Sequence, residues 1–214
     1  MYIKRHMTGD PVTIPEDMLL PEARQLLNEC HFQHLPVVNR DGLLVGMVTD
    51  RDLRSAWPSS VLSKAEHQLV YEQVRQTCVV EIMSTDLMTL SPDATLDDAL
   101  LLFTRDRVGA LPVVDEGRVV GIFSSRDLLA AYKRLFGVGE KGSILVVLED
   151  DGRPDLMSRL VTLLERQGVA FTRLLKVYDP DQGGSIFLRL NTFKLGKVCS
   201  LLEADGFRVR RPEC

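Results

Sequence analysis

Short apolar runs occur in two pairs along the first part of the chain. One pair covers residues 35–38 and 43–49, and the other covers residues 110–114 and 119–124. A polar stretch that contains a glycine separates the two runs of each pair, at residues 39–42 and at residues 115–117. Apolar runs joined by such a turn are typical of β-hairpins. The pattern therefore predicts two hairpins.

The two hairpins belong to an internal repeat. The sequence Leu-Pro-Val-Val stands at 35–38 and again at 111–114, and Met7 and Met83 precede these runs at the same spacing. Equivalent positions are 76 residues apart before the hairpin turn and 75 residues apart after it. The lost residue falls in the turn, where length changes are tolerated. Because an internal repeat marks repeated structural units, residues 1–137 predict two copies of one fold.

Each copy also predicts two helices. Thr95 and Asp98 have the spacing of a capping box that starts a helix over 96–105. Pro21 suits the first turn of the corresponding helix, where its missing N–H is not needed. A second helix is expected to begin near Asp50 and near Ser125. With extended stretches at 12–14 and 87–90, each copy is predicted to be β-α-β-β-α.

A connecting segment and a third unit complete the predicted organisation. Apolar residues at 61, 65, 69, 71 and 74 have roughly helical spacing, so a helix is expected between the copies. After the glycine-rich stretch 136–142, strands are expected at 143–148, 169–178, 185–190 and 207–210, with helices from 156 to 168 and over 193–204. This β-α-β-β-α-β order is ferredoxin-like. The predicted class is α+β, with repeats at 1–56 and 82–137, a helical linker at 57–81 and the third unit at 142–214.

Composition narrows the function classes. The 214 residues carry a net charge of −4, which argues against a dedicated nucleic-acid-binding protein. No apolar run approaches the length of a membrane span, and the first residues lack the pattern of a signal peptide. The four cysteines form no C-x-x-C pair, so zinc binding is not expected. Scattered cysteines of this kind favour a cytoplasmic location. Without a nucleophile motif, a P-loop or a paired-acid site, we expect no enzymatic activity and no required cofactor.

Candidate chemistry lies where each hairpin leads into its second helix. Residues 46–52 and 121–127 each contain a glycine, then a hydroxyl residue, an arginine and an aspartate. Glycine lets a ligand approach the backbone, and a hydroxyl at a helix start can donate to a phosphate. The arginine can supply positive charge, and the aspartate can accept hydrogen bonds from ribose hydroxyls. These positions are Gly46, Thr49, Arg51 and Asp52, and Gly121, Ser124, Arg126 and Asp127.

The same positions have a purely structural interpretation. A hydroxyl residue followed three positions later by an aspartate is also a capping box, in which both side chains bind backbone N–H groups of the helix start. One such box is explained by capping alone. Two boxes at equivalent places, each after a Leu-Pro-Val-Val run, favour a ligand site.

The repeats resemble the cystathionine-β-synthase-type (CBS) domain family, whose paired domains form a Bateman module. The resembling motifs stand at 7–13, 34–38 and 46–52, and again at 83–89, 110–114 and 121–127. The resemblance implies an adenosine ligand between the repeats: AMP, ADP, ATP or S-adenosylmethionine. Thr49 and Ser124 would meet phosphate and Asp52 and Asp127 ribose, while the backbone at 33–34 and 109–110 would meet adenine. The remaining residues of the predicted site are Thr13, Gln33, His34, Pro36, Thr89, Gly109, Ala110 and Pro112.

The third unit resembles the small regulatory ACT domain, and the whole arrangement is similar to bacterial acetoin-utilisation accessory proteins. In the ACT family a glycine often follows the proline of the first β-α turn, whereas here Asp155 follows Pro154. We therefore expect domain pairing rather than amino-acid binding from this unit. The resemblance implies a homodimer that senses an adenine nucleotide for an enzyme or transporter. The alternative is a ligand-independent assembly scaffold, in which the boxes are only helix caps.

Overall fold

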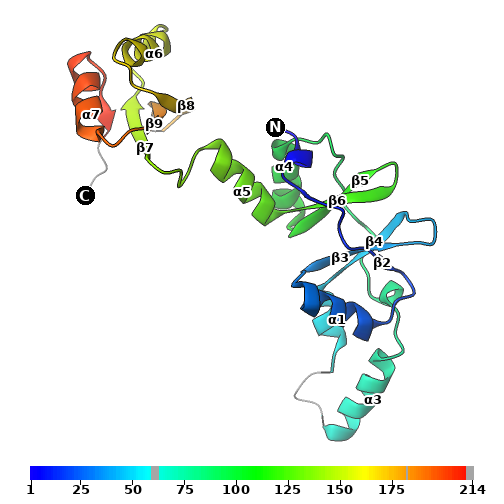
Figure 1. Ribbon diagram of the computed structural model, residues 1–214. Helices are drawn as coiled ribbons and strands as arrows, with labels where there is room; N and C mark the ends of the chain where they lie inside the picture. Colours follow the sequence, from blue (N-terminus) through cyan, green and yellow to red (C-terminus); the bar gives the residue numbers. More distant parts are fainter. Residues whose placement is uncertain (59–62, 182, 211–214) are drawn as a thin grey trace. The chain divides into compact units, whose positions relative to one another are not determined.

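The computed structural model describes residues 1–58, 63–181 and 183–210 and consists of two compact units, Met1–Ala131 and Tyr132–Cys214 (Figure 1). The first unit contains both repeats. Its second part ends within a helix, α5 (Ser125–Leu135), whose last residues belong to the second unit. Each unit is described by itself below.

The first unit contains the predicted elements of both repeats. In the first repeat these are β2 (Ile14–Pro15), α1 (Leu20–Cys30), β3 (His34–Val38), β4 (Leu44–Thr49) and α2 (Asp50–Ala56). In the second they are α4 (Leu96–Asp106), β5 (Ala110–Asp115), β6 (Arg118–Ser124) and α5. The predicted connecting helix is confirmed as α3 (Lys64–Val74), although position 61 lies outside the described residues.

Two hairpins form the centres of the two sheets in this unit. Strand β3 pairs antiparallel with β4, and β5 pairs antiparallel with β6, with a register shift after Val37 and after Val113. Strand β2 lies parallel to β3, and Leu90 makes the equivalent parallel bridge to Val113. Both hairpins that the apolar pattern predicts are therefore confirmed.

Each repeat contributes a short segment near its N-terminal end to the sheet of the other repeat. Strand β1 (Thr8–Gly9) of the first repeat pairs with β6 of the second, where Thr8 faces Ile122. In the opposite direction Ser84 bridges to Met47 of β4 through two backbone hydrogen bonds of 3.0 and 2.9 Å. In Figure 1 the blue N-terminal segment accordingly runs to the green strands of the second repeat. The exchange joins the two repeats into one unit.

Two single-turn 3-10 helices extend this exchange. In η1 (Ile3–Arg5) the N–H of Ile3 donates to the carbonyl of Ala94, just before α4. In η2 (Val79–Glu81) the N–H of Val79 donates to the carbonyl of Met18, just before α1. Each repeat thus closes over the start of the other repeat's first helix.

The core of the first repeat lies between its sheet and its helices. Apolar side chains of α1, β3, β4 and α2 are fully or almost fully buried there, because the alternation of the strands and the helical spacing of α1 turn them to one side. Val74 and Val79 of the linking segment join this cluster. The cluster consists of Ile14, Leu20, Ala23, Leu27, Leu35, Val37, Val48, Leu53, Val74 and Val79.

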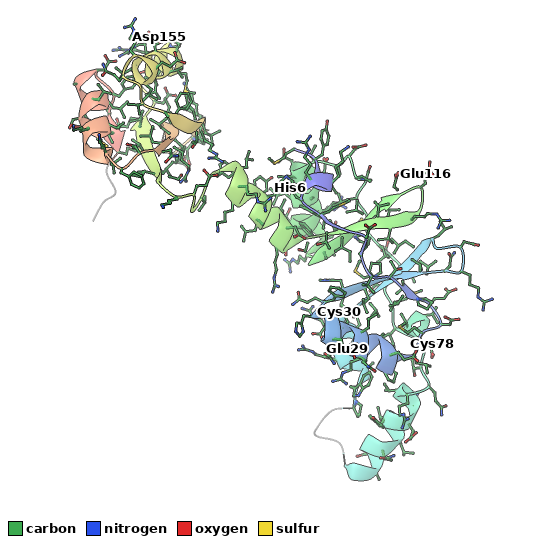
Figure 2. The ribbon with its side chains drawn as sticks, viewed as in Figure 1. His6, Glu29, Cys30, Cys78, Glu116 and Asp155 are labelled. Carbon is green, nitrogen blue, oxygen red and sulfur yellow. The ribbon has the colours of Figure 1, made fainter. Side chains whose placement is uncertain are left out.

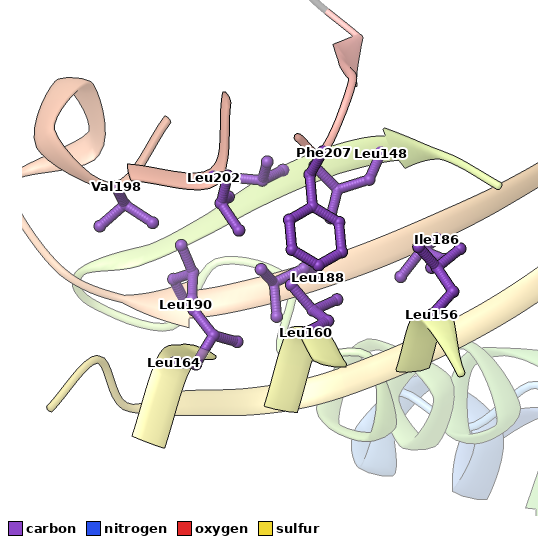
Figure 3. Packing of buried hydrophobic residues seen from close by; sticks show 11 residues of the cluster. Leu148, Leu156, Leu160, Leu164, Ile186, Leu188, Leu190, Val198, Leu202 and Phe207 are labelled. Atoms are coloured by element: carbon purple, nitrogen blue, oxygen red, sulfur yellow. The ribbon is translucent and has the colours of Figure 1, made fainter. Parts of the chain in front are cut away.

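The second unit has the predicted β-α-β-β-α-β order. Its elements are β7 (Ser143–Glu149), α6 (Leu156–Arg166), β8 (Phe171–Asp179), β9 (Gly183–Asn191), α7 (Leu195–Ala204) and β10 (Val209–Arg210). The four strands form an antiparallel sheet in the order β10-β7-β9-β8. Figure 3 shows its core, in which leucines of α6 and α7 pack on Leu148, Leu188 and Leu190 of the sheet and on Phe207.

Several element ends in this unit differ by one or two residues from the prediction, and two of these shifts have a clear cause. Helix α7 begins at Leu195 rather than at 193, because Thr192 Oγ1 accepts a hydrogen bond from the N–H of Lys194 and holds the preceding turn. The last strand begins at Val209, since Phe207 is buried in the core instead of pairing in the sheet. The class is α+β, as predicted.

Several chemical features of the described residues bear on function. Cys30, Cys78 and Cys199 are free thiols, and Figure 2 shows the first two beside the first repeat. Within residues 1–58, 63–181 and 183–210, no three metal-ligating side chains gather into a group. The helices of this same portion of the chain are too short or too polar to cross a membrane.

Candidate functional site

A cleft of about 1000 Å³ lies in the first unit, lined by residues of both repeats. Clefts of this volume bind small organic ligands in many proteins. Its walls are the start of β3, the β4–α2 junction, the segment 84–88 and the α4–β5 junction. From the predicted set it brings together Gln33, His34, Thr49, Arg51, Asp52, Gly109, Ala110 and Pro112.

Strand pairing places the predicted adenine and ribose positions beside one another. His34 is the register partner of Thr49, and the N–H of Asp50 donates to the carbonyl of Gln33 over 3.1 Å. The start of β3 is thereby fixed next to the start of α2. In the second repeat Ala110 faces Ser124, and the N–H of Ser125 donates to the carbonyl of Gly109. The two copies therefore build the same local frame.

The first box is a complete helix cap. Oδ2 of Asp52 accepts from the N–H of Thr49 over 2.9 Å and from Thr49 Oγ1 over 2.6 Å. The N–H of Asp52 in turn donates to Oγ1 over 3.3 Å. Both side chains are partly buried. The predicted capping box is thus present in the first repeat.

The second box has the same geometry. Oδ2 of Asp127 accepts from the N–H of Ser124 over 2.8 Å and from Ser124 Oγ over 2.6 Å, and the N–H of Asp127 donates to Oγ over 3.3 Å. The second repeat has serine where the first has threonine, and the cap is the same in both. Ser124, Arg126 and Asp127 do not line the cleft that contains Asp52.

A complete cap still leaves one ligand contact open in each box. The bonds that each carboxylate accepts all end on Oδ2, and among the described residues Oδ1 of Asp52 and Oδ1 of Asp127 accept no hydrogen bond. An ionised carboxylate oxygen has two lone pairs that can accept from hydroxyls such as those of ribose. The capping and ribose-binding roles of the aspartates are therefore compatible.

The hydroxyl groups are less available than the sequence predicts. Each hydroxyl has one proton, and Thr49 and Ser124 both donate it to their aspartates. While this bond is present, neither hydroxyl can donate to a phosphate. Phosphate binding in this cleft must then use other donors.

The glycines at 46 and 121 have a packing role that was not predicted from the sequence. A Cβ at Gly46 would collide with the sulfur of Met83, and a Cβ at Gly121 would collide with the sulfur of Met7. Each glycine thus makes room for the methionine that the other repeat contributes. That these glycines also let a ligand approach the backbone stays a prediction.

The histidine of the cleft packs against the second repeat. A Cβ on Gly109 would lie 3.3 Å from Nε2 of His34, so the missing side chain at Gly109 leaves room for the imidazole. Burial lowers the pKa of His34 below its usual 6.5, and the nearby Asp52 carboxylate raises it in partial compensation. Burial therefore favours the neutral form of His34.

Other members of the predicted set lie elsewhere. Pro36 is buried in β3, and Thr13 and Thr89 precede the first strands of their repeats, where Thr13 is partly buried and Thr89 exposed. Neither these three residues nor Gly46, Gly121, Ser124, Arg126 and Asp127 line the cleft.

Several cleft residues were not predicted from the sequence. Segment 84–88 lines it because the exchanged Ser84 pairs with β4, and that exchange has no signature in the apolar pattern. Arg107 is exposed directly after α4, and it lines the cleft as well. Its signal was its place directly before the predicted adenine positions 109–110.

Comparison with known proteins agrees with this architecture. The model of the CBS domain family matches residues 3–59 and 79–134. A CBS domain-containing protein of Dictyostelium discoideum is 36% identical over 130 residues, which covers 60% of this chain and 89% of the relative.

Two solved structures are similar to the first unit. A protein of Vibrio cholerae named for acetoin utilization is 26% identical, with a TM-score of 0.54 over 65% of this chain and 96% of that chain. The CBS domain pair of protein MJ0100, solved with 5-methylthioadenosine and S-adenosyl-L-methionine, is 28% identical, with a TM-score of 0.50 over 64% of this chain and 96% of that chain. The repeat, the exchanged segments and these matches agree: the chain belongs to the CBS domain family, of which it carries a tandem pair.

Proposed function

We propose that the protein is a regulatory, non-catalytic module that binds an adenosine-containing ligand in the cleft of its first unit. The observation that carries the proposal is the convergence of residues 33–34, Asp52 with its open Oδ1 and residues 109–110 on one cleft of about 1000 Å³. The complexes of the MJ0100 domain pair with two adenosine derivatives support this ligand class.

The binding mode follows from the available groups. Oδ1 of Asp52 accepts from the ribose hydroxyls, and the adenine ring lies against backbone at 33–34 and 109–110. Met47, which is buried, and Val108, which is partly buried, add apolar contact area, since both line the same cleft.

Regulation follows if the ligand favours one arrangement of the two repeats. A ligand shifts such an equilibrium only by its difference in affinity for the two states. Walls from both repeats support this mechanism, because the affinity of a ligand that contacts both repeats depends on how they are arranged. The regulated target that we propose is an enzyme or a transporter of the same compartment, the cytoplasm.

The second unit extends this proposal. Its four-stranded sheet covered by two helices resembles a small regulatory domain such as ACT, and Asp155 stands exposed before α6 (Figure 2). We assign it to subunit pairing in a homodimer rather than to amino-acid binding. Sedimentation of the full chain tests this assignment, and a species of only 24.0 kDa at micromolar concentration would contradict it.

Isothermal titration calorimetry tests the ligand. Protein is unfolded and refolded to remove retained nucleotide and is then titrated with AMP, ADP, ATP and S-adenosylmethionine. We expect saturable heat with at least one of them and loss of that heat at the first cleft in Asp52→Ala. No heat with any of the four would reject the proposal.

One observation favours the scaffold as a second candidate. Both boxes make the full set of capping hydrogen bonds, as a purely structural role requires. Under that candidate, Asp52→Ala lowers stability and leaves every ligand affinity unchanged.

A further inference from the structure

Two guanidinium groups of the cleft have no acidic partner. Of the arginines that line it, Arg54 is paired with Asp50 through a contact of 2.7 Å. Arg51 and Arg107 form no ion pair with any described residue. Asp106, the acidic neighbour of Arg107, is held by Arg105 at 3.0 Å. The cleft therefore contains one available cation from each repeat.

An anion in this cleft needs these cations. The Thr49 hydroxyl donates to Asp52, so it has no proton left for a phosphate. The N–H of Asp52 donates to Oγ1 of Thr49, and that of Asp50 donates to the carbonyl of Gln33. Guanidinium groups bind phosphate through paired, charge-assisted hydrogen bonds. Arg51 and Arg107 are thus the strongest donors that remain.

The residues equivalent to the cleft arginines differ in the other copy of the repeat. Position 31 is equivalent to position 107 and holds histidine, and position 129 is equivalent to 54 and holds an exposed leucine. Only Arg126, the equivalent of Arg51, supplies a permanent positive charge among these three positions. The two boxes therefore differ in the anionic charge that their surroundings can neutralise.

The backbone at Arg107 has a conformation that suits glycine better than arginine. Arg107 follows α4 in the left-handed region with φ of 53°, and His31 follows α1 with φ of 55°. Glycine is the residue that this conformation favours. A charged side chain at such a position has a conformational cost that glycine would avoid.

We propose that Arg107, acting with Arg51, makes the first cleft selective for an adenosine ligand that carries phosphate. The inference rests on the proposed function and specifies its ligand class. Arg107 comes from the second repeat and Arg51 from the first, so phosphate joins the two repeats across the cleft. A neutral or cationic adenosine derivative gains nothing from these groups.

Calorimetry with AMP and with adenosine tests this selectivity in the full chain. All proteins carry Asp127→Asn, which weakens ribose binding at the second box so that the heat reports the first cleft. Arg107→Gly removes the guanidinium and suits the left-handed backbone. His31→Gly is the matched control, because it makes the same backbone change at the equivalent position outside the cleft.

We expect Arg107→Gly to weaken AMP binding by about tenfold or more, as the loss of a charge-assisted contact does, and to change adenosine binding by less than about twofold. Its thermal midpoint should be unchanged or raised. Arg107→Lys should recover part of the AMP affinity, and His31→Gly should leave both affinities unchanged.

The outcomes separate this inference from the proposed function. Equal effects of Arg107→Gly on AMP and adenosine, or no effect on either, would overturn the selectivity while leaving the adenosine site in place. A parent protein that binds neither compound would overturn the proposed function and the inference with it.

Discussion

The Thr49/Asp52 box and the Ser124/Asp127 box contain the same three hydrogen bonds, with lengths that agree within 0.1 Å. Their surroundings differ, since Arg107 near the first box corresponds to His31 in the other copy. Local sequence thus determines the cap, whereas residues from other segments determine the chemistry that a ligand meets. Equivalent motifs in a repeat are therefore not equivalent sites.

The largest expected effect tests the structural equivalence of the two repeats. Gly46→Val and Gly121→Val each place a side chain where the methionine of the other repeat lies, so each should lower the free energy of unfolding by about 1–3 kcal/mol, as overpacking does. Urea unfolding measures the change. Similar losses in the two variants would confirm that the exchanged segments serve both repeats alike.

Gly9→Val is the matched control for these variants. Gly9 lies in the exchanged strand β1, and a Cβ there would meet no atom within 4 Å. Its stability should change by less than about 0.5 kcal/mol, as for other surface substitutions. Losses at Gly46 and Gly121 no larger than in this control would contradict the packing role of the glycines.

The next effect separates the cap from the ligand site. Asp52→Ala and Asp127→Ala each remove a helix cap, so both should lower stability by about 1 kcal/mol. Only Asp52→Ala should abolish nucleotide binding in the cleft, because only Asp52 lines it. Calorimetry and urea unfolding on the same samples give both quantities. Unchanged affinity in Asp52→Ala would favour the scaffold.

The smallest effect concerns pH and His34. Burial lowers the pKa of His34 in the folded state below the 6.5 expected in the unfolded chain, so the unfolded chain binds the proton first. The stability of the folded state should therefore fall as the pH decreases through and below about 6.5. Thermal midpoints at pH 7.5 and pH 5.5 should differ more in the wild type than in His34→Gln.

His31→Gln is the control for this experiment, since it removes an exposed histidine at the end of α1. Its midpoint should follow pH as the wild type does. A wild-type pH dependence that persists in His34→Gln would assign the effect to other groups.

Local patterns account for what could be predicted from the sequence. The hairpins, the capping boxes at Thr49, Thr95 and Ser124, and the β-α-β-β-α-β order of the second unit each depend on residues close in the chain. Such interactions leave a period or a fixed spacing in the sequence. The ends of elements were less well predicted, as the late start of α7 shows.

The exchange between repeats could not be predicted in this way. A two-residue strand such as β1 has no periodicity, and its partner β6 is more than a hundred residues away. The exchange determines which residues share the cleft, so Ser84 and Arg107 were missed as lining residues. It also explains Gly46, whose partner Met83 belongs to the other repeat.

A crystal structure determined from crystals of the protein grown in the presence of AMP would test the central claim most directly. The account predicts one nucleotide in the cleft of the first unit, with its ribose hydroxyls within hydrogen-bond distance of Oδ1 of Asp52 and its phosphate between Arg51 and Arg107. An empty cleft at saturating AMP, or a nucleotide bound only at the Ser124/Asp127 box, would contradict it.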